Sequence, residues 1–250
     1  MTERDGRPQQ SERLLRTVAL TKSFGGIRAI DRLDLGVARG ELRCLIGPNG
    51  AGKSTLFSLI AGIHRADAGR IFFKGEDITR LPPFRRVLRG ICLKFQTTRV
   101  YRDLSISQNL LVALALRGPE RRDGDTAGRL AWALATFGLD RDGDRPAREL
   151  PHSHQQWLEI CLALATDPDL LLLDEPTAGM TPDETALTAD FVRRLNGQGT
   201  TILVVEHDMT FVRQIARAVT VLHYGRVIAE GPLAAIEANK DVRRIYLGEQ

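Results

Sequence analysis

The chain has 250 residues, 43% of them apolar and 26% charged, which is enough to bury a sizeable core as one large domain or two lobes. Its formal net charge of +4 is spread along the sequence. This weak excess argues against a nucleic-acid-binding protein and is compatible with work beside an anionic membrane face. Three cysteines without metal or disulfide spacing favour a reducing cytoplasm. We expect neither a signal peptide nor a membrane-spanning segment.

Strand signals dominate the first part of the chain. Residues 1–12 are polar, and we expect a flexible tail there. Leu14–Leu20 is strand-like, Phe24-Gly25-Gly26 predicts a turn, and alternating apolar residues over Ile30–Val37 predict a half-buried strand. Glu41–Ile46 is a largely apolar run between two glycines, which is typical of a buried strand.

The next segment, Gly47-Pro48-Asn49-Gly50-Ala51-Gly52-Lys53-Ser54-Thr55, fits G-x-x-x-x-G-K-[ST], the phosphate-binding loop of nucleotide-hydrolysing proteins. Its glycines let backbone N–H groups curl toward phosphate oxygens. Lys53 adds a positive charge for the β- and γ-phosphates, and Ser54 offers a hydroxyl to Mg²⁺. The residues from Thr55 to Ile60 predict a helix whose N-terminus attracts the anion.

The middle of the chain changes from strands to helices. The predicted elements are a turn at Ala68-Gly69, a strand at Arg70–Phe73, a short basic helix at Pro82–Arg89, helices between Ser105 and Ala165, and a polar loop at Gly118–Gly128. We therefore predict a helical subdomain at about residues 97–166, inserted into an α/β domain of residues 13–250.

Strands and helices alternate again toward the C-terminus, which predicts a largely parallel sheet. The predicted elements are strands at Asp169–Leu173 and Thr200–Val205, helices at Pro182–Leu195 and Phe211–Ala216, a hairpin around Tyr224-Gly225, and a mostly helical tail at Leu233–Leu247.

Two acids follow the apolar run Leu170–Leu173. The carboxyl ends of strands in open parallel sheets face the ligand crevice, so Asp174 and Glu175 should lie there. Asp174 would bind Mg²⁺ through water, and Glu175 would polarise an attacking water. An ordinary solvated strand end is the alternative, which the upstream phosphate loop disfavours.

Two further polar residues lie at junctions near the same edge. His207, in Val205-Glu206-His207-Asp208, follows the next apolar strand and could hydrogen-bond the γ-phosphate while holding the attacking water. Gln96 precedes the helical insertion and could contact Mg²⁺ or the water while sensing movement of the insertion. Alone, neither residue type is specific.

Taken in order, the phosphate loop, Gln96, a segment near Leu150, Asp174-Glu175 and His207 resemble the motifs of ATP-binding cassette (ABC) ATPases, the motor subunits of ABC transporters. The resemblance covers about Leu14–Gly248. It implies an α/β P-loop NTPase fold with a RecA-like core, an antiparallel β subdomain and a helical subdomain, and ATP and Mg²⁺ as cofactors. It also implies that Phe24 stacks on adenine, although a partly buried turn aromatic is an equal alternative.

The segment Leu150-Pro151-His152-Ser153-His154 departs from the family's Leu-Ser-Gly-Gly-Gln signature, which contacts the ATP of the other subunit in a head-to-tail pair. Pro151 removes a hydroxyl donor, Ser153 adds bulk where backbone approaches phosphate, and His154 replaces the Gln. His152 and His154 could donate when protonated. We expect a weakened signature that slows only the site on the partner's phosphate loop. Substitution with little effect is the alternative.

Short segments resemble particular importers. Those most like the ATPase subunits of urea or short-amide importers are Gly40–Cys44, Gln156–Ile160, Ala178–Thr181 and Phe211–Ala216, and Ile245–Gly248 is shared with branched-chain amino acid importers. The resemblance implies a second, different ATPase subunit, two permeases and a solute-binding protein, with this chain at the cytoplasmic face of the cell membrane. Arg99 and Tyr101 would receive a permease helix, or be ordinary surface.

Three other functions stay open. A non-transport ABC ATPase usually has a long coiled-coil insertion or a second cassette, and this length holds neither. A GTPase needs an Asn-Lys-x-Asp guanine reader, which Asn239-Lys240-Asp241-Val242 resembles only superficially. An ATP-gated regulatory subunit with weak hydrolysis fits the unusual segment near Leu150 but not the acid Glu175 and His207.

Overall fold

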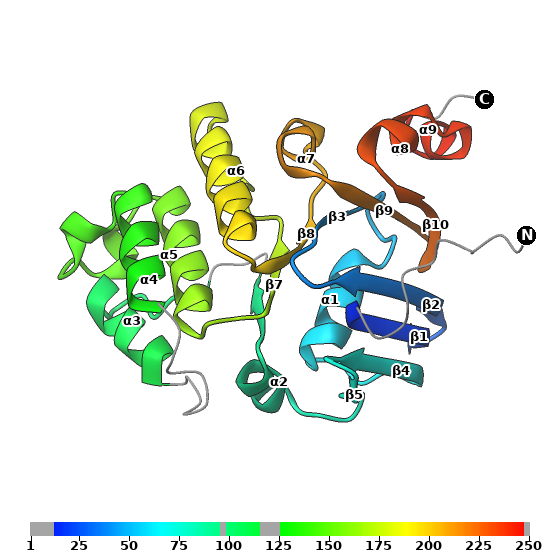
Figure 1. The fold of residues 1–250 in the computed structure, drawn as a ribbon, viewed down its shortest axis with the longest axis horizontal. Helices are drawn as coiled ribbons and strands as arrows, with labels where there is room; N and C mark the ends of the chain where they lie inside the picture. Colours follow the sequence, from blue (N-terminus) through cyan, green and yellow to red (C-terminus); the bar gives the residue numbers. More distant parts are fainter. Residues whose placement is uncertain (1–12, 96–98, 116–125, 248–250) are drawn as a thin grey trace, which may run out of the picture.

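The structure is a computed structural model, and it describes residues 13–95, 99–115 and 126–247. Its larger sheet has six strands in the order β10-β9-β3-β8-β7-β6 (Figure 1). The strands are β3 (Leu42–Ile46), β6 (Ile91–Lys94), β7 (Leu170–Asp174), β8 (Thr201–Val205), β9 (Ala218–His223) and β10 (Arg226–Gly231). Neighbours pair in parallel except β9 and β10, which are antiparallel, so the predicted largely parallel sheet is confirmed.

The register of this sheet brings several strand ends to one edge. Leu45 of β3 and Asp174 of β7 both lie beside Val205 of β8. β3, β7 and β8 are buried along their whole length, which explains their nearly continuous apolar sequences. The residues that follow these three strands therefore emerge next to one another.

The smaller sheet is antiparallel, with strand order β2-β1-β4-β5. Its strands are β1 (Arg13–Phe24), β2 (Ile27–Ala38), β4 (Ala68–Phe73) and β5 (Glu76–Asp77). The predicted turn at Ala68-Gly69 is wrong, because both residues belong to β4. Gly69 has φ +85°, and a Cβ there would lie 2.4 Å from the carbonyl oxygen of Ala19. The glycine is explained by this close approach of two strands and not by a turn.

Nine α-helices are described: α1 (Lys53–Ala61), α2 (Pro83–Arg89), α3 (Ile106–Ala115), α4 (Thr126–Thr136), α5 (His152–Ala165), α6 (Pro182–Gly197), α7 (Met209–Ile215), α8 (Leu233–Ala238) and α9 (Lys240–Leu247). The predicted loop at Gly118–Gly128 is wrong at its end, since α4 begins at Thr126, and residues 118–125 lie outside the described part. Among the described residues, no helix is both long and apolar enough to cross a bilayer.

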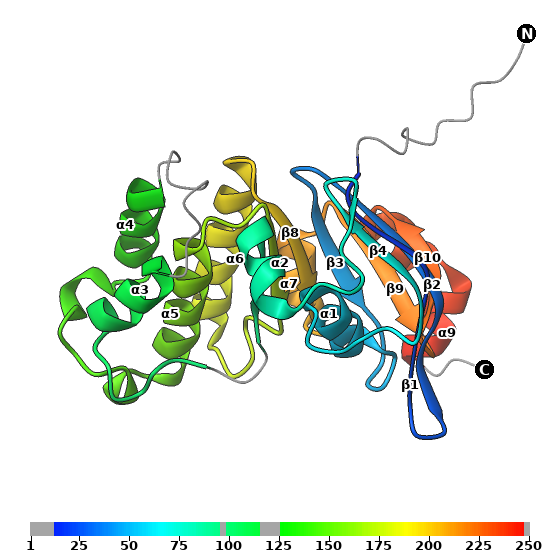
Figure 2. The same ribbon diagram turned by 90° about the horizontal axis from the view of Figure 1, so that it is seen from below.

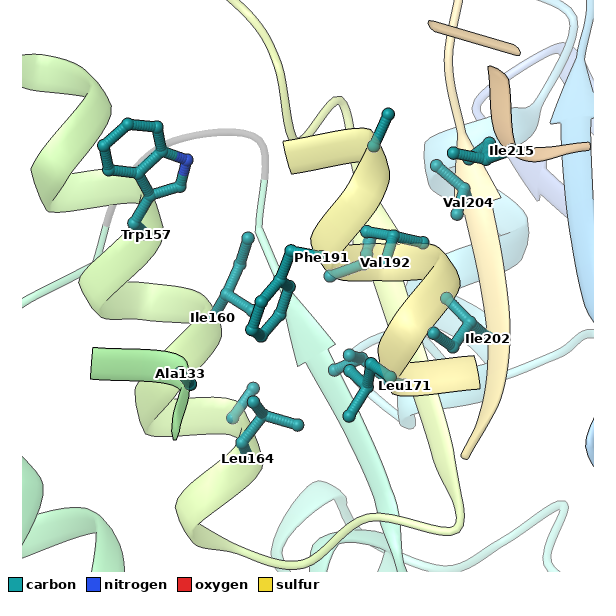
Figure 3. Close-up of a cluster of buried hydrophobic side chains, with 14 of the residues drawn as sticks. Ala133, Trp157, Ile160, Leu164, Leu171, Phe191, Val192, Ile202, Val204 and Ile215 are labelled. Carbon is teal, nitrogen blue, oxygen red and sulfur yellow. The ribbon is translucent and has the colours of Figure 1, made fainter. Parts of the chain in front are cut away.

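The helices α3, α4 and α5 group at the end of the molecule away from β1, β2 and β4 (Figures 1 and 2). Aromatic stacking joins this group to α6. The ring of Phe137 stacks on Trp157 of α5 at 4.9 Å between centroids, and Trp132 of α4 stacks on Phe191 of α6 at 4.7 Å. Figure 3 shows Ile160 of α5 beside the ring of the α6 residue Phe191.

The three cysteines are free thiols. Cys44 and Cys161 are buried and Cys92 is half-buried, each within or beside apolar packing. Burial raises the pKa of Cys44 to about 12, and it also raises the pKa values of Cys92 and Cys161. These side chains therefore act as small apolar core residues.

Candidate functional site

The loop between β3 and α1 wraps around the side chain of Lys53. The Lys53 ammonium donates hydrogen bonds to the carbonyl oxygens of Gly47 at 2.7 Å and Pro48 at 3.0 Å, and the residue is 7% exposed. Gly52 has φ +105°, and a Cβ there would lie 2.4 Å from the carbonyl oxygen of Ala29. A side chain at this position is therefore excluded both by conformation and by space.

Asp174 ends β7 and is 6% exposed. Burial raises its pKa to about 6; the charge of Glu175 adds to the shift, and the Ser54 hydroxyl, which hydrogen-bonds the carboxylate, opposes it. Its Oδ1 atom has no hydrogen-bond partner among the described residues. A buried carboxylate oxygen left unpaired beside a hydroxyl is a costly arrangement that a bound cation would relieve.

These residues fit Mg²⁺ chemistry. Mg²⁺ prefers oxygen ligands, keeps several waters and is held by one or two protein groups together with phosphates. Within the described part of the chain no cluster of three His, Cys, Asp or Glu side chains could hold a metal ion by itself. Ser54 and Asp174 offer the sparse oxygen set expected of Mg²⁺ bound with a nucleotide.

Glu175 and His207 lie together at this edge. Glu175 has φ +46°, and its N–H donates to the carbonyl oxygen of Val205 at 2.9 Å. The His207 Nδ1 atom lies 3.5 Å from Glu175 Oε1. The Glu175 side chain is 17% exposed and the His207 side chain 62%, so both are accessible to a ligand. A non-glycine residue at positive φ is costly and is concentrated at functional sites.

Burial also acts on the cation of the site. It lowers the pKa of Lys53, and the charges of Glu175 and Asp174 oppose that shift. One ammonium and two carboxylates thus influence one another at the ends of β3 and β7. This arrangement can bind a polyanion and a cation together.

Glu206 is part of the site, and the sequence reasoning gave it no role. It is 1% exposed and accepts hydrogen bonds from the Thr177 hydroxyl at 2.7 Å, from the Thr177 N–H at 3.3 Å and from the His207 N–H at 3.1 Å. It thereby fastens the loop after Glu175 to the loop carrying His207. The sequence feature that could have identified Glu206 is its position at the end of an apolar strand.

The segment Leu150–His154 forms the start of α5, with Pro151 as its N-cap and no side-chain cap. The Ser153 hydroxyl donates to Glu184 Oε1 at 2.6 Å, and the residue is 6% exposed. Its side chain is therefore held against Glu184 of α6. The His154 ring packs on Trp157 at 5.0 Å between centroids.

Phe24 presents an accessible ring, 43% exposed. The rings of Phe24 and His64 form a T-shaped pair at 5.1 Å between centroids, and Lys22 Nζ lies 5.3 Å from the Phe24 centroid. Gln96 lies outside the described residues. Beyond it, the Arg99 guanidinium stacks on Phe95 at 3.9 Å.

The backbone at Tyr101 is held by the side chain of Asn109. Asn109 Oδ1 accepts from the Tyr101 N–H at 2.9 Å, and its amide donates to the Tyr101 carbonyl oxygen at 3.0 Å. Tyr101 itself is 58% exposed, so a fixed loop presents a large aromatic side chain to the surface.

Comparison with known proteins gives one consistent result. Residues 30–178 match the family model described as "ABC transporter". A "Probable ABC transporter ATP-binding protein" of Azorhizobium caulinodans is 36% identical over 98% of this chain and 87% of its own length. The "High-affinity branched-chain amino acid transport ATP-binding protein LivG" of Escherichia coli K12 is 35% identical over 96% of this chain and 99% of its own.

Solved structures agree with these sequence matches. A nucleotide-free ATP-binding cassette from an ABC transporter superposes with a TM-score of 0.83 at 30% identity, covering 95% of this chain and 100% of that one. An ATP-binding cassette of an ABC transporter in its ADP conformation gives 0.83 at 31% identity, covering 95% and 99%.

Proposed function

Because the chain belongs to the ATP-binding proteins of ABC transporters, we propose that it is the ATPase subunit that energises an importer of branched-chain amino acids or of urea and short amides. The observation that carries this proposal is the convergence of Lys53, Asp174, Glu175 and His207 at the ends of β3, β7 and β8. The name of the LivG relative supports the amino acid class, and the segments near Gln156 and Ala178 support the urea class.

Each residue at this edge has a role in the proposal. The loop Gly47–Thr55 and Lys53 bind the phosphates of ATP, and Ser54, Asp174 and Gln96 hold Mg²⁺, which offsets phosphate charge when bound. Glu175 orients and polarises the attacking water, and His207, within reach of Glu175, holds that water against the γ-phosphate. Phe24 stacks on the adenine.

The proposed assembly follows from the same assignment. Two ATPase subunits pair head to tail, and the segment Leu150–His154 contacts the ATP of the partner. Closure around two ATP molecules switches the opening of two permeases, and hydrolysis resets them. The chain would lie at the cytoplasmic face of the cell membrane, receiving a permease helix near Arg99 and Tyr101 and acting indirectly with a solute-binding protein.

Replacement of the proposed base tests the function. Glu175→Gln should bind ATP but lose at least about a hundredfold in hydrolysis rate, because the water is no longer activated. The variant should also trap the closed dimer, seen as an ATP-dependent shift in size-exclusion chromatography. Glu237→Gln is the matched control, since this exposed side chain pairs with Arg213 at 3.0 Å. Normal turnover of Glu175→Gln would show that another group is the base.

A regulatory subunit with weak hydrolysis is a second candidate. It is favoured by Pro151, which stands where the family signature has a serine and leaves the start of α5 without a side-chain cap. The two candidates predict different ATPase rates for a complex in which Glu175 of this chain is the sole intact catalytic base. An energising ATPase subunit would hydrolyse ATP in that complex, and a regulatory subunit would hydrolyse little.

A further inference from the structure

A buried chain of hydrogen bonds joins three segments around α5. Lys94 is fully buried at the end of β6, and its ammonium donates to Gln156 Oε1 at 3.1 Å. Gln156 is 1% exposed, and its amide nitrogen lies 2.7 Å from the carbonyl oxygen of Ala178 and 2.9 Å from His152 Nε2. The amide of Gln156 is thus the junction of the three segments.

The chemistry of Lys94 fixes the direction of this chain. An ammonium has donors and no acceptor, so the oxygen of the Gln156 amide must face it. The two N–H groups of the amide then point at Ala178 and His152. Because His152 Nε2 receives an N–H, it must be the unprotonated nitrogen of a neutral ring, with the proton on Nδ1. This differs from the sequence-based expectation that His152 donates when protonated.

The segments joined in this way are all parts of the proposed machinery. His152 is the first residue of α5, the segment proposed to meet the partner's ATP. Ala178 follows the proposed base Glu175 by three positions, and Lys94 precedes Gln96 by two. The next residue of the same loop, Gly179, lies near His152, since a Cβ added to it would be 3.5 Å from the His152 ring.

A buried lysine needs compensation, and the site supplies it. Burial lowers the pKa of Lys94, while the charges of Glu159, Asp174, Glu206 and Glu175 raise it. The acids that serve the proposed reaction therefore help to keep the ammonium charged. These carboxylates offset part of the cost of burying a cation at a position where packing alone would favour an apolar residue.

We propose that Lys94 and Gln156 are positioning residues that hold His152 as the neutral Nδ1–H tautomer and fix the loop after Glu175 against the start of α5. The proposal rests on the function proposed above and deepens it. The Gln156 amide would thus fix the position of Glu175, the base of this chain's own ATP site, relative to the segment that completes the partner's site.

The variant Gln156→Glu separates positioning from folding. A carboxylate still accepts from Lys94 but cannot donate to Ala178 or His152. In the complex with the partner subunits, we expect kcat for ATP hydrolysis to fall roughly tenfold, because displaced reacting groups lose rate before they lose binding. The KM for ATP should stay within about twofold and the thermal midpoint within a few degrees. Gln108→Glu on α3, exposed and retaining its acceptor oxygen, is the matched control.

The tautomer gives a readout that a general loss of stability would not produce. In ¹⁵N–¹H spectra of the full chain, assigned with His152→Gln, the wild-type His152 should show the Nδ1–H form at pH 7.5. In Gln156→Glu the proton should move to Nε2, toward the new carboxylate.

The outcomes are distinct. Wild-type hydrolysis in Gln156→Glu, or a wild-type His152 carrying its proton on Nε2 at pH 7.5, would overturn the proposal. A wild-type complex without ATPase activity would instead overturn the proposed function, and the spectra would still decide the tautomer.

Discussion

Glu159 shows how one buried carboxylate can hold a functional segment. It is 6% exposed on α5, and it accepts hydrogen bonds from the backbone N–H groups of Arg99, at 3.1 Å, and Phe95. These two residues flank Gln96. Burial raises the pKa of Glu159 to about 7, and the charges of Lys94 and Arg99 and the two backbone bonds oppose the shift. The carboxylate thus fastens the chain on both sides of a proposed active-site residue.

This raised pKa predicts a pH-dependent stability. The folded state keeps a proton that the unfolded chain loses above the ordinary value of 4.5, so the contribution of Glu159 to the free energy of unfolding falls as pH rises from 4.5 to 7. Glu159→Gln removes the titration. The free energy of unfolding of the variant minus that of wild type should increase from pH 5 to pH 8, by at most about 3 kcal/mol. Urea unfolding at both pH values measures the difference.

The exposed acid Glu76 gives the control for this experiment. Its side chain is 66% exposed and pairs with Arg89 at 3.1 Å, so Glu76→Gln should show nearly the same difference from wild type at both pH values. A constant difference for Glu159→Gln as well would mean that Glu159 is ionised in the folded protein throughout this range.

At the scale of elements, α2 is joined to the end of α1 by a single arginine. Arg86 is 2% exposed, and its guanidinium donates to the carbonyl oxygens of Leu59 at 2.6 Å, Ile60 at 2.8 Å and Leu81 at 3.0 Å. The first two are carbonyls of the last turn of α1, where the helix dipole favours a cation, and the Leu59 carbonyl also accepts from the Gly62 N–H at 3.2 Å. Burial lowers the pKa of Arg86 to about 10, which leaves it charged at neutral pH.

Removing this guanidinium should loosen the helix that follows the phosphate loop. Arg86→Met leaves several buried carbonyls without donors and should lower the free energy of unfolding by roughly 3 kcal/mol in urea denaturation. Arg85→Met on the same helix is the control, because Arg85 is exposed and lies over the ring of Phe84 at 5.9 Å. Equal losses in the two variants would show that the carbonyl contacts of Arg86 contribute little.

The start of α5 leads to a second prediction at this scale. Ser153→Gly combined with His154→Gln restores the family pattern at two positions and should raise the single-turnover hydrolysis rate at the partner's site several-fold. The accompanying loss of the bond to Glu184 is tolerable, since Glu184 also completes the capping box of α6 with Thr181.

Ser153→Ala is the control for that double variant, since it removes the bond to Glu184 without restoring the pattern. An unchanged rate at the partner's site in the double variant would mean that the natural segment is already functional.

At the scale of the whole molecule, the role proposed for the segment Leu150–His154 predicts which assemblies are active. A pair of identical chains would complete both ATP sites with Leu150–His154, so the purified chain alone should hydrolyse ATP slowly even at high concentration. Addition of a partner subunit with a Leu-Ser-Gly-Gly-Gln segment should give turnover that is lost in Glu175→Gln. Steady-state assays over a range of protein concentrations decide this. Rapid, cooperative turnover by the chain alone would refute the asymmetry.

The sequence was sufficient for the parts of the fold built from local signals. β3, β7 and β8 are short apolar runs bounded by glycine or acids, and their ends carry the phosphate loop, Asp174 and His207. Lys94 and Arg86 could not be placed in this way, because polar residues in short elements are usually exposed. Lys94 is buried, and its hydrogen-bond partner Gln156 lies 62 positions further along the chain. No local sequence pattern contains both residues. Gly69 was misread because close packing and turns favour the same residue.

The burial of the three thiols makes this protein convenient for labelling chemistry. The thiolate is the nucleophile that attacks thiol-reactive reagents, and a raised pKa keeps Cys44, Cys92 and Cys161 protonated. A cysteine introduced at an exposed position such as Leu111, which is 65% exposed, would therefore react far faster than the natural ones. Spin labels or fluorophores placed in this way could follow the approach of two subunits without first removing any native cysteine.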